Sequence, residues 1–484
     1  MHVVLLVDFG STHTKVLAVD LDREEVVGRS QAMTTVDEDI TIGLNNALEH
    51  LFSQSAVTEA DVVARYASSS AAGGLRMAAI GLVPSLTLEA ARRAALGAGA
   101  KVVWSSGYEL DETSLDEMRS AACDIILLSG GTDGGDRKTI IANARLIAQS
   151  DIAAPVIVAG NRVAASAVRQ ILADAGKASY QVENVLPLLD RLNVEPAQAL
   201  IRDLFIRQIT AAKGLNRAQE YIGDIVMPTP KATLQAATLL ADGTADEPGI
   251  GPLLVVEVGG ATINIHSVAD GQPTDRKTVL RGLPETRTKR TVEGDLGIRY
   301  NAPTILEFVG AARLRERLRS VLPGVSIEEG ELEARVHALS ADVGHVPRND
   351  VDDAIDRVLA ASAVAFAVER HAGTLRQEFT LAGDVKVQVG KDLTQVQNLV
   401  GTGGIFKYGR WPGEVLASAL YDAAVPWSLK PMKPAAWIDQ EYLLYGIGLL
   451  AEHSPDKALR IAKKYLRGVV LDTTAAASAA TSAA

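Results

Sequence analysis

The chain has 484 residues and a formal net charge of −11, with 47% hydrophobic and only 4% aromatic residues. This length suits two or three domains rather than one core. The negative charge argues against nucleic acid or an anionic membrane as the main partner. The single cysteine, Cys123, excludes an intramolecular disulfide and a multi-cysteine metal site. No uncharged apolar run is long enough to span a bilayer and no cleavage signal precedes the first strand, so we predict a cytoplasmic protein.

Residues 3–20 open as an apolar run and resume as a β-branched run after a short turn. Asp8 closes the first run, and Gly10, Ser11 and Thr12 fill the turn. The pattern predicts a strand, a tight turn and an antiparallel strand. The N–H groups and hydroxyls of such a turn can wrap phosphate oxygens, and the carboxylate can hold the accompanying Mg²⁺. Taken alone, the pattern is weak and more often marks an ordinary hairpin.

A second copy of this pattern occupies residues 253–268. Glu257 corresponds to Asp8 and Gly259 to Gly10, both at an offset of 249 residues. Such a repeat suggests an internally duplicated α/β protein. Two acidic hairpins that face each other would clamp a metal-bound polyphosphate from both sides.

Residues 123–136 are typical of a buried parallel strand that runs into a glycine-rich loop. Ligands of open α/β sheets bind beyond the carboxyl ends of the strands, so Gly130, Gly131 and Asp133 are candidate site residues. A flexible crossover loop is the alternative interpretation. Strands and helices alternate on both sides of this loop, which predicts a mainly parallel sheet flanked by helices.

Apolar residues at helical spacing predict helices over residues 40–52, 87–96, 138–149, 163–175, 197–212, 233–240, 349–369, 438–452 and 455–466. Strand signals fade between residues 182 and 240. We interpret residues 65–74 as a small-residue loop between strands. The charges of residues 287–300 favour a solvated loop, in which Glu293 and Asp295 are minor site candidates.

Residues 397–406 repeat the theme of a strand, a glycine turn and the start of a helix. Gly401, Thr402, Gly403 and Gly404 form this turn. The motif is often only a turn. In a chain that also carries two acidic hairpins, it is the best candidate for the segment on which a nucleoside packs.

These stretches resemble the actin/Hsp70/sugar-kinase ATPase superfamily. Residues Asp8–Lys15 resemble its first phosphate motif, Glu257–Thr262 its second, and Val400–Gly404 its adenosine motif. The second motif usually carries Asp where this chain has Glu257, and the longer side chain still reaches a metal-bound water. The resemblance implies two duplicated actin-like (ribonuclease H-like) α/β domains with a nucleotide cleft between them, plus helical insertions.

Within that superfamily the chain resembles the glutamate mutase accessory family, called GlmL or MutL, which is unrelated to the mismatch-repair protein that shares the second name. The match is carried by VDFGSTHTK (7–15), LLSGGTDGGD (127–136), LNVEPAQALIRDLFIRQITAAKGL (192–215), VEVGGATINIHSV (256–268), TVEGDLGIRYNAP (291–303) and LVGTGGIF (399–406). It implies a chaperone-like ATPase that reactivates an adenosylcobalamin-dependent mutase by exchanging damaged cofactor. The mutase partner is implied by the resemblance alone.

We place the first actin-like domain at residues 1–190, completed by the C-terminal helices near 438–466. A helical connector is expected at 191–248 and the second actin-like domain at 249–437. The Ala/Ser/Thr-rich residues 472–484 are expected to form a disordered tail.

The expected ligands are ATP and Mg²⁺. Asp8 and Glu257 would hold Mg²⁺, through waters because this ion dehydrates reluctantly. Asp133 would orient the attacking water, ahead of Glu293 and Asp295, since phosphoryl transfer depends on positioning and charge neutralisation. The residues expected to contact the nucleotide are Gly10, Ser11, Thr12, Thr14, Lys15, Gly130, Gly131, Gly259, Gly260, Ala261, Thr262, Gly401, Thr402, Gly403 and Gly404.

Two other functions would use the same clamp. A small-molecule kinase would place an acceptor hydroxyl where the water sits, and its turnover would depend on a metabolite. An actin-like scaffold would bind ATP and assemble. The sequence does not fix the oligomeric state, and a homodimer stays open.

Overall fold

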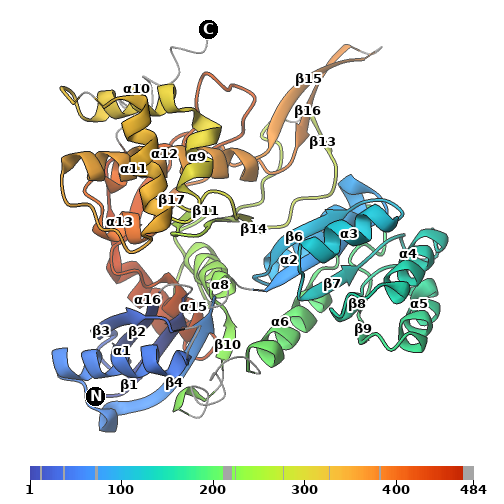
Figure 1. The fold of residues 1–484 in the computed structure, drawn as a ribbon, viewed down its shortest axis with the longest axis horizontal. Coiled ribbons are helices and arrows are strands. Elements are labelled where there is room, and N and C mark those ends of the chain that lie inside the picture. The colour runs from blue at the N-terminus through green and yellow to red at the C-terminus, as the bar shows by residue number, and fades with distance from the viewer. Residues whose placement is uncertain are drawn as a thin grey trace. The chain divides into compact units, whose positions relative to one another are not determined.

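The computed structural model describes residues 1–10, 13–35, 39–70, 75–210, 221–223, 225–275, 277–325, 327–380 and 383–471. The chain divides into two compact units. The first comprises residues 1–233, 282–284 and 448–457, and the second comprises residues 234–281, 285–447 and 458–484. The division falls inside three helices, α8 (Thr229–Asp242), α15 (Leu444–Ala451) and α16 (Pro455–Tyr465). Figure 1 labels the elements of both units.

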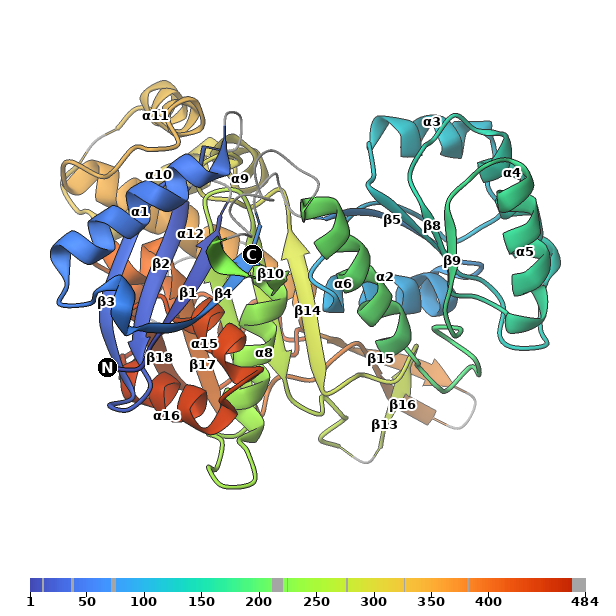
Figure 2. The same ribbon diagram turned by 90° about the horizontal axis from the view of Figure 1, so that it is seen from below.

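The first sheet of the first unit has the order β10-β4-β1-β2-β3. Its strands are β1 (Val3–Phe9), β2 (His13–Asp20), β3 (Glu25–Met33), β4 (Val62–Ser69) and β10 (Ile225–Pro228). Val3, Leu5 and Val7 pack against the buried face of α1 (Ile40–Gln54), which lies along the sheet in Figure 2. Because side chains alternate along a strand, Asp8 belongs to the opposite face of this sheet.

The second sheet of the first unit is wholly parallel and has the order β6-β5-β7-β8-β9. Met77 and Ile125 enter a core with α2 and α6, while Ile126 enters a core with α3, α4 and α5. Figure 2 shows these two groups of helices on opposite sides of the sheet. The chain therefore forms a doubly wound α/β subdomain between β4 and β10 of the first sheet. Its strands and helices are β5 (Arg76–Ile80), α2 (Glu89–Gly97), β6 (Lys101–Ser106), α3 (Glu112–Ser120), β7 (Ile125–Leu128), α4 (Lys138–Gln149), β8 (Val156–Val158), α5 (Arg162–Asp174), β9 (Ser179–Gln181) and α6 (Glu195–Thr210).

The main sheet of the second unit has the order β14-β12-β11-β17-β18-β19. Its first five strands repeat β3-β2-β1-β4-β10 in order and in direction. Asp8 pairs with Lys15 and Glu257 with Asn264, so both members of the second pair follow the first by 249 residues. The strands are β11 (Leu253–Val258), β12 (Ile263–Val268), β14 (Thr288–Glu293), β17 (Asn398–Gly403), β18 (Ala435–Asp439) and β19 (Leu466–Gly468).

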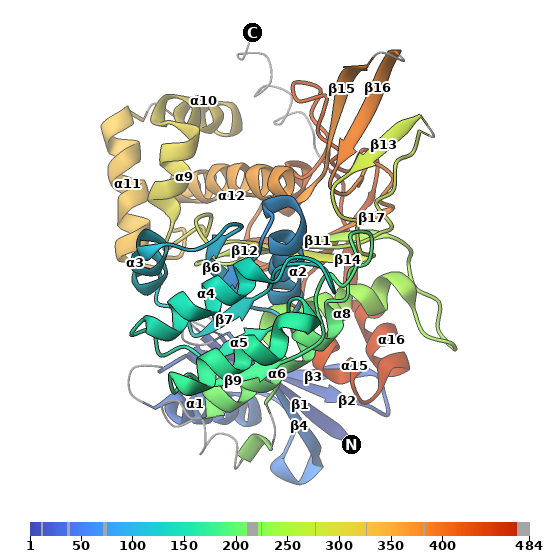
Figure 3. The ribbon, with the colours of Figure 1, turned by 90° about the vertical axis from the view of Figure 1, so that its right-hand side faces the viewer.

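The long helix α12 (Asp350–His371) covers one face of this sheet and packs against Leu254, Val256 and Val258. Glu257 alternates with these residues and so belongs to the other face. The remaining helices of the unit are α9 (Ala302–Val309), α10 (Ala311–Val321), α11 (Glu329–Ala341), α13 (Gly404–Tyr408) and α14 (Pro412–Ala417). A separate sheet, prominent in Figure 3, has the order β13-β16-β15, with β13 (Thr278–Arg281), β15 (Thr374–Thr380) and β16 (Gly383–Val389).

The predicted fold of two duplicated actin-like α/β domains with helical insertions is confirmed by the matching strand orders and by the shared hairpin register. The predicted tail at 472–484 lies outside the described residues. Within the described ranges, no helix combines the length and the apolar composition needed to cross a membrane.

Several local predictions are wrong. Residues 65–69, expected in a loop, belong to β4, and the segment expected to lack strands contains β10. Residues 438 and 439, expected to start a helix, end β18 instead. Small or apolar residues in these segments fit more than one local structure, and pairing with distant strands decides between them.

The expected solvated loop at residues 287–300 is also wrong in part, because β14 occupies Thr288–Glu293. Its Arg290 is only 5% exposed and pairs across the sheet with His266. The charged residues suggested a solvent-exposed loop rather than a strand. A buried cation is favourable only beside a suitable partner, and the local sequence does not show that partner.

Candidate functional site

Asp8 is held near the end of β1 by residues from three other segments. Its carboxylate is 1% exposed and accepts a hydrogen bond from Lys15 Nζ at 2.9 Å, across the hairpin. Thr229 Oγ1 donates to the other carboxylate oxygen at 2.6 Å, and Ser68 Oγ lies 3.5 Å from it. Lys15 is 22% exposed, so the positive end of this ion pair reaches solvent while the carboxylate stays buried.

The turn that follows β1 requires glycine at position 10. Gly10 donates its N–H to the carbonyl of His13 at 3.1 Å, and a Cβ there would lie 2.6 Å from that oxygen. Ser11 and Thr12 lie outside the described residues. Thr14 shares a face with Phe9, away from Asp8, and its hydroxyl lies 3.1 Å from that of Thr34.

Glu257 occupies the corresponding place in the second unit, with different partners. It is 8% exposed, and His266 Nε2 lies 3.2 Å from its carboxylate. Burial lowers the pKa of His266, so the neutral ring donates to Glu257. Burial also lowers the pKa of Arg290 to about 10, against the raising effect of Glu257. Arg290 is therefore still charged at neutral pH and is the buried cation that compensates Glu257.

In the turn after β11 the carbonyl oxygens accept hydrogen bonds from the protein, whereas backbone N–H groups are available to a ligand. The oxygens of Gly259, Gly260 and Ala261 accept from Ile298, from Arg299 and Tyr300, and from the Asn301 side chain, at 2.8–3.2 Å. The Thr262 oxygen accepts from Gly259 N–H at 3.0 Å, which repeats the Gly10–His13 bond. Within the described chain, the N–H groups of Gly260, Ala261 and Thr262 donate to no protein acceptor. Such a group of amides favours an anion.

The predicted turn at Gly401–Gly404 is wrong, because Gly401, Thr402 and Gly403 end β17 and Gly404 begins α13 directly. The segment is closely packed on one side and open on the other. A Cβ at Gly401 would lie 2.8 Å from the buried Phe406 ring, and one at Gly403 would lie 2.2 Å from the Val258 carbonyl. A Cβ at Gly404 would meet nothing within 4 Å. Thr402 is the strand neighbour of Glu257, and its hydroxyl donates to Asp439 at 2.8 Å.

The loop that carries Gly130, Gly131 and Asp133 follows β7, in the second sheet of the first unit rather than beside Asp8. Both glycines have positive φ, of 145° and 71°. Asp133 accepts from the Arg162 N–H and from the Asn184 side chain, both at 3.0 Å. Its role in orienting water therefore stays a prediction.

Glu293 and Asp295 lie in the second unit and both pair with Arg370, at 2.6 and 3.2 Å. Sequence reasoning missed four residues that hold the two acids, namely Ser68, Thr229, His266 and Arg290. Their signal is cross-strand register, which becomes visible only once the strand order is known. Asp8 and Glu257 belong to different units, and their convergence on one ion stays a prediction.

The donor set fits MgATP better than a metal bound by protein alone. No group of three or more His, Cys, Asp or Glu side chains able to hold a metal occurs among the described residues. Mg²⁺ commonly takes one or two carboxylates, with phosphates and waters completing its shell. One carboxylate and one glycine turn in each unit match that pattern.

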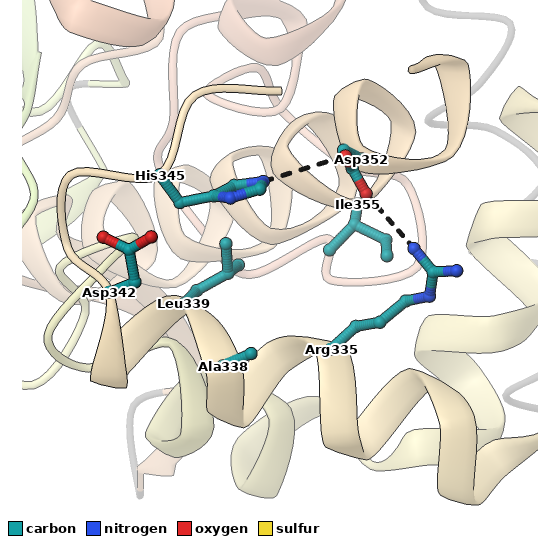
Figure 4. A pocket seen from close by; sticks show the side chains of 7 residues that line it. All are labelled: Arg335, Ala338, Leu339, Asp342, His345, Asp352 and Ile355. Carbon is teal, nitrogen blue, oxygen red and sulfur yellow. Dashed lines mark hydrogen bonds and ion pairs between the residues drawn. The ribbon is translucent and has the colours of Figure 1, made fainter. Parts of the chain in front are cut away.

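A pocket of about 210 Å³ lies between α11 and the start of α12 (Figure 4). Three of its polar side chains pair with one another, since Asp352 lies 3.2 Å from Arg335 and 3.7 Å from His345. Ligand pockets typically span about 300–1,000 Å³. We therefore do not assign the nucleotide to this pocket, which is lined by Arg335, Ala338, Leu339, Asp342, His345, Asp352 and Ile355.

Comparison with known proteins gives one relative at high identity and several distant folds. A family model described as "MutL protein" matches residues 4–466. "Protein MutL" of Clostridium tetanomorphum is 44% identical over 466 residues, which cover 96% of this chain and 99% of the relative. A nucleotide-free acetone carboxylase structure is 11% identical, with a TM-score of 0.39, and the match covers 93% of this chain and 70% of that one. Gluconate kinase of Lactobacillus acidophilus is 10% identical, with a TM-score of 0.35 and coverage of 99% and 95%.

We expect Gly403→Ala to lower the melting temperature and Gly404→Ala to leave it almost unchanged. Gly403 has a φ of 110° and faces the Val258 carbonyl, whereas Gly404 faces open space. Strain at such a φ costs about 1–3 kcal/mol. Calorimetry of both variants tests this expectation, and equal melting temperatures would contradict it.

Asp439 should make stability depend on pH. Burial raises the pKa of Asp439, although hydrogen bonds from Leu443, Leu444 and Thr402 lower it. A carboxyl whose folded pKa is raised contributes stability below its unfolded pKa and loses that contribution as pH rises through the folded pKa. Wild type should therefore lose more stability than Asp439→Asn on going from about pH 4 to about pH 8. Melting temperatures that diverge in the opposite direction would refute this.

Proposed function

The chain belongs to the MutL protein family, and we propose that it binds and hydrolyses ATP to reactivate an adenosylcobalamin-dependent mutase of the glutamate mutase type. In this proposal it promotes the exchange of damaged cofactor for intact cofactor. The observation that carries the nucleotide part is the turn at Gly259–Thr262, which offers three N–H groups while its carbonyls are engaged. A turn of this kind favours phosphate over a neutral ligand.

In the proposed mechanism each unit supplies one carboxylate and one glycine turn. Asp8 and Glu257 would hold Mg²⁺, whose charge would neutralise the phosphates. Gly260, Ala261 and Thr262 donate backbone N–H groups to phosphate oxygens. Lys15, which donates to Asp8 at 2.9 Å, would supply a positive charge to the phosphates.

The adenosine would lie where β17 ends and α13 begins, at Gly401–Gly404, where Gly404 leaves open space. Asp133 is the proposed water-orienting carboxylate. A change in the closure of the two units on hydrolysis would be sensed by the bound partner.

Asp8→Asn should abolish Mg²⁺-dependent ATP hydrolysis, by at least about a hundredfold, because it removes a charge with little change in volume. Asp20→Asn is the matched control, since Asp20 is equally buried at 1% exposure but lies at the far end of β2. Phosphate release at saturating ATP measures both. Unchanged turnover in the Asp8 variant would remove Asp8 from the site.

Reactivation is tested with purified glutamate mutase that carries an inactivated cobalamin. We expect activity to return only when this chain, ATP, Mg²⁺ and intact adenosylcobalamin are all present, and we expect Asp8→Asn to fail. ATP turnover that requires a metabolite and yields a phosphorylated product would instead support a small-molecule kinase. Nucleotide-dependent pelleting without reactivation would support a scaffold.

A further inference from the structure

The doubly wound subdomain at residues 75–194 is not used by the proposed nucleotide chemistry, apart from the loop after β7. Its strand order is β6-β5-β7-β8-β9, so β5, which comes first in the sequence, occupies the second position in the sheet. In parallel sheets of this order, ligands bind outside the carboxyl ends of the strands, near the point where the strand order reverses. That point lies between β5 and β7.

Among residues 75–194 of this subdomain, the exposed large apolar side chains all lie at that carboxyl edge. They are Val83, Tyr108, Val163, Leu188 and Leu189, with exposures of 36, 67, 52, 54 and 64%. Val83 follows β5, Tyr108 follows β6, Val163 follows β8, and the two leucines follow β9. All residues from 75 to 194 are described, and none of the loops at the amino edge carries such a side chain. This distribution marks one edge as an interaction surface.

The loops at this edge form a single preorganised surface. Each is tied to a neighbour by a backbone hydrogen bond: Gly81 N–H to Ser106, Ser129 N–H to Ile80, Asn161 N–H to Gly130, and Asp133 N–H to Pro187. Thr87 Oγ1 accepts from the N–H groups of Leu82 and Val83 at 2.7 and 3.0 Å. The Asn184 side chain donates to the Gly131 carbonyl at 3.0 Å. Because these polar groups are already hydrogen-bonded within the protein, they do not require a charged ligand. The apolar side chains of the edge are left for contact with a partner.

The width of the edge indicates what covers it. Tyr108 and Leu188 follow strands at opposite ends of the five-stranded sheet, four interstrand spacings apart, which is about 19 Å. A stable protein interface covers about 800 Å² on each partner, a patch of comparable breadth. Acidic and basic side chains, such as Asp136 and Arg137 or Asp190 and Arg191, stand together around the edge. That mixture does not favour a polyanion such as nucleic acid or an anionic membrane.

We propose that the carboxyl edge of this sheet is the docking surface for an apolar, weakly charged patch on the partner enzyme. The inference rests on the proposed function for the identity of that enzyme. Tyr108 and the Leu188–Leu189 pair are the anchors, because they are the most exposed large apolar side chains of the edge and lie at its two ends.

The test measures the affinity of the full chain for purified glutamate mutase, with ATP and with ADP. Tyr108→Ser and the double variant Leu188→Ser/Leu189→Ser should each weaken binding by about tenfold or more. Val346→Ser, at a site 70% exposed in the second unit, is the matched control and should bind as wild type does. Basal ATP hydrolysis and melting temperature should stay unchanged in all three, because the altered side chains are exposed.

Hydrogen exchange provides a second measurement that needs no variant, because mutase binding should slow exchange in the loops at 81–88 and 107–111. Wild-type binding to the mutase with full affinity in the edge variants would overturn the docking surface and leave the proposed function standing. No binding of wild type to the mutase would overturn the proposed function as well. A change in oligomeric state in the edge variants, measured by light scattering, would assign the edge to a second copy of this chain.

Discussion

The burial of one carboxylate in each large sheet is the constraint on which the rest of the structure depends. A buried, unpaired carboxylate is strongly destabilising, so each acid needs compensating groups before its sheet is stable. For Asp8 these come from Lys15, Ser68 and Thr229, on β2, on β4 and after β10. Three segments that are distant in sequence must therefore be in place before this acid is accommodated.

The two acids are compensated in different ways although their hairpins share one register. The cation beside Asp8 is a lysine that is 22% exposed, whereas the cation that acts on Glu257 is an arginine that is 5% exposed. A lysine ammonium on a flexible stem can move into solvent, while a buried guanidinium is fixed by its surroundings. The ion pair of Asp8 is therefore easier to rearrange than the surroundings of Glu257.

The sequence predicted what is local and repeated. The two hairpins and the helix that begins at Asp350 were visible, because each depends on residues a few positions apart. It did not predict β14, because Arg290 appears solvated until His266 is known to lie beside it. Ser68 and Thr229 were missed because their role depends on strand neighbours, and strand order is a property of the whole sheet.

The doubly wound subdomain leaves the first sheet after β4 and returns to it at β10. These two strands are parallel neighbours, and the hydroxyls that contact Asp8 lie at their ends, on Ser68 and Thr229. The subdomain is therefore joined to the first sheet through the two strands whose ends lie beside this carboxylate. Movement of the insert would therefore act on the two strand ends whose hydroxyls contact Asp8, which would couple its position to the surroundings of that carboxylate.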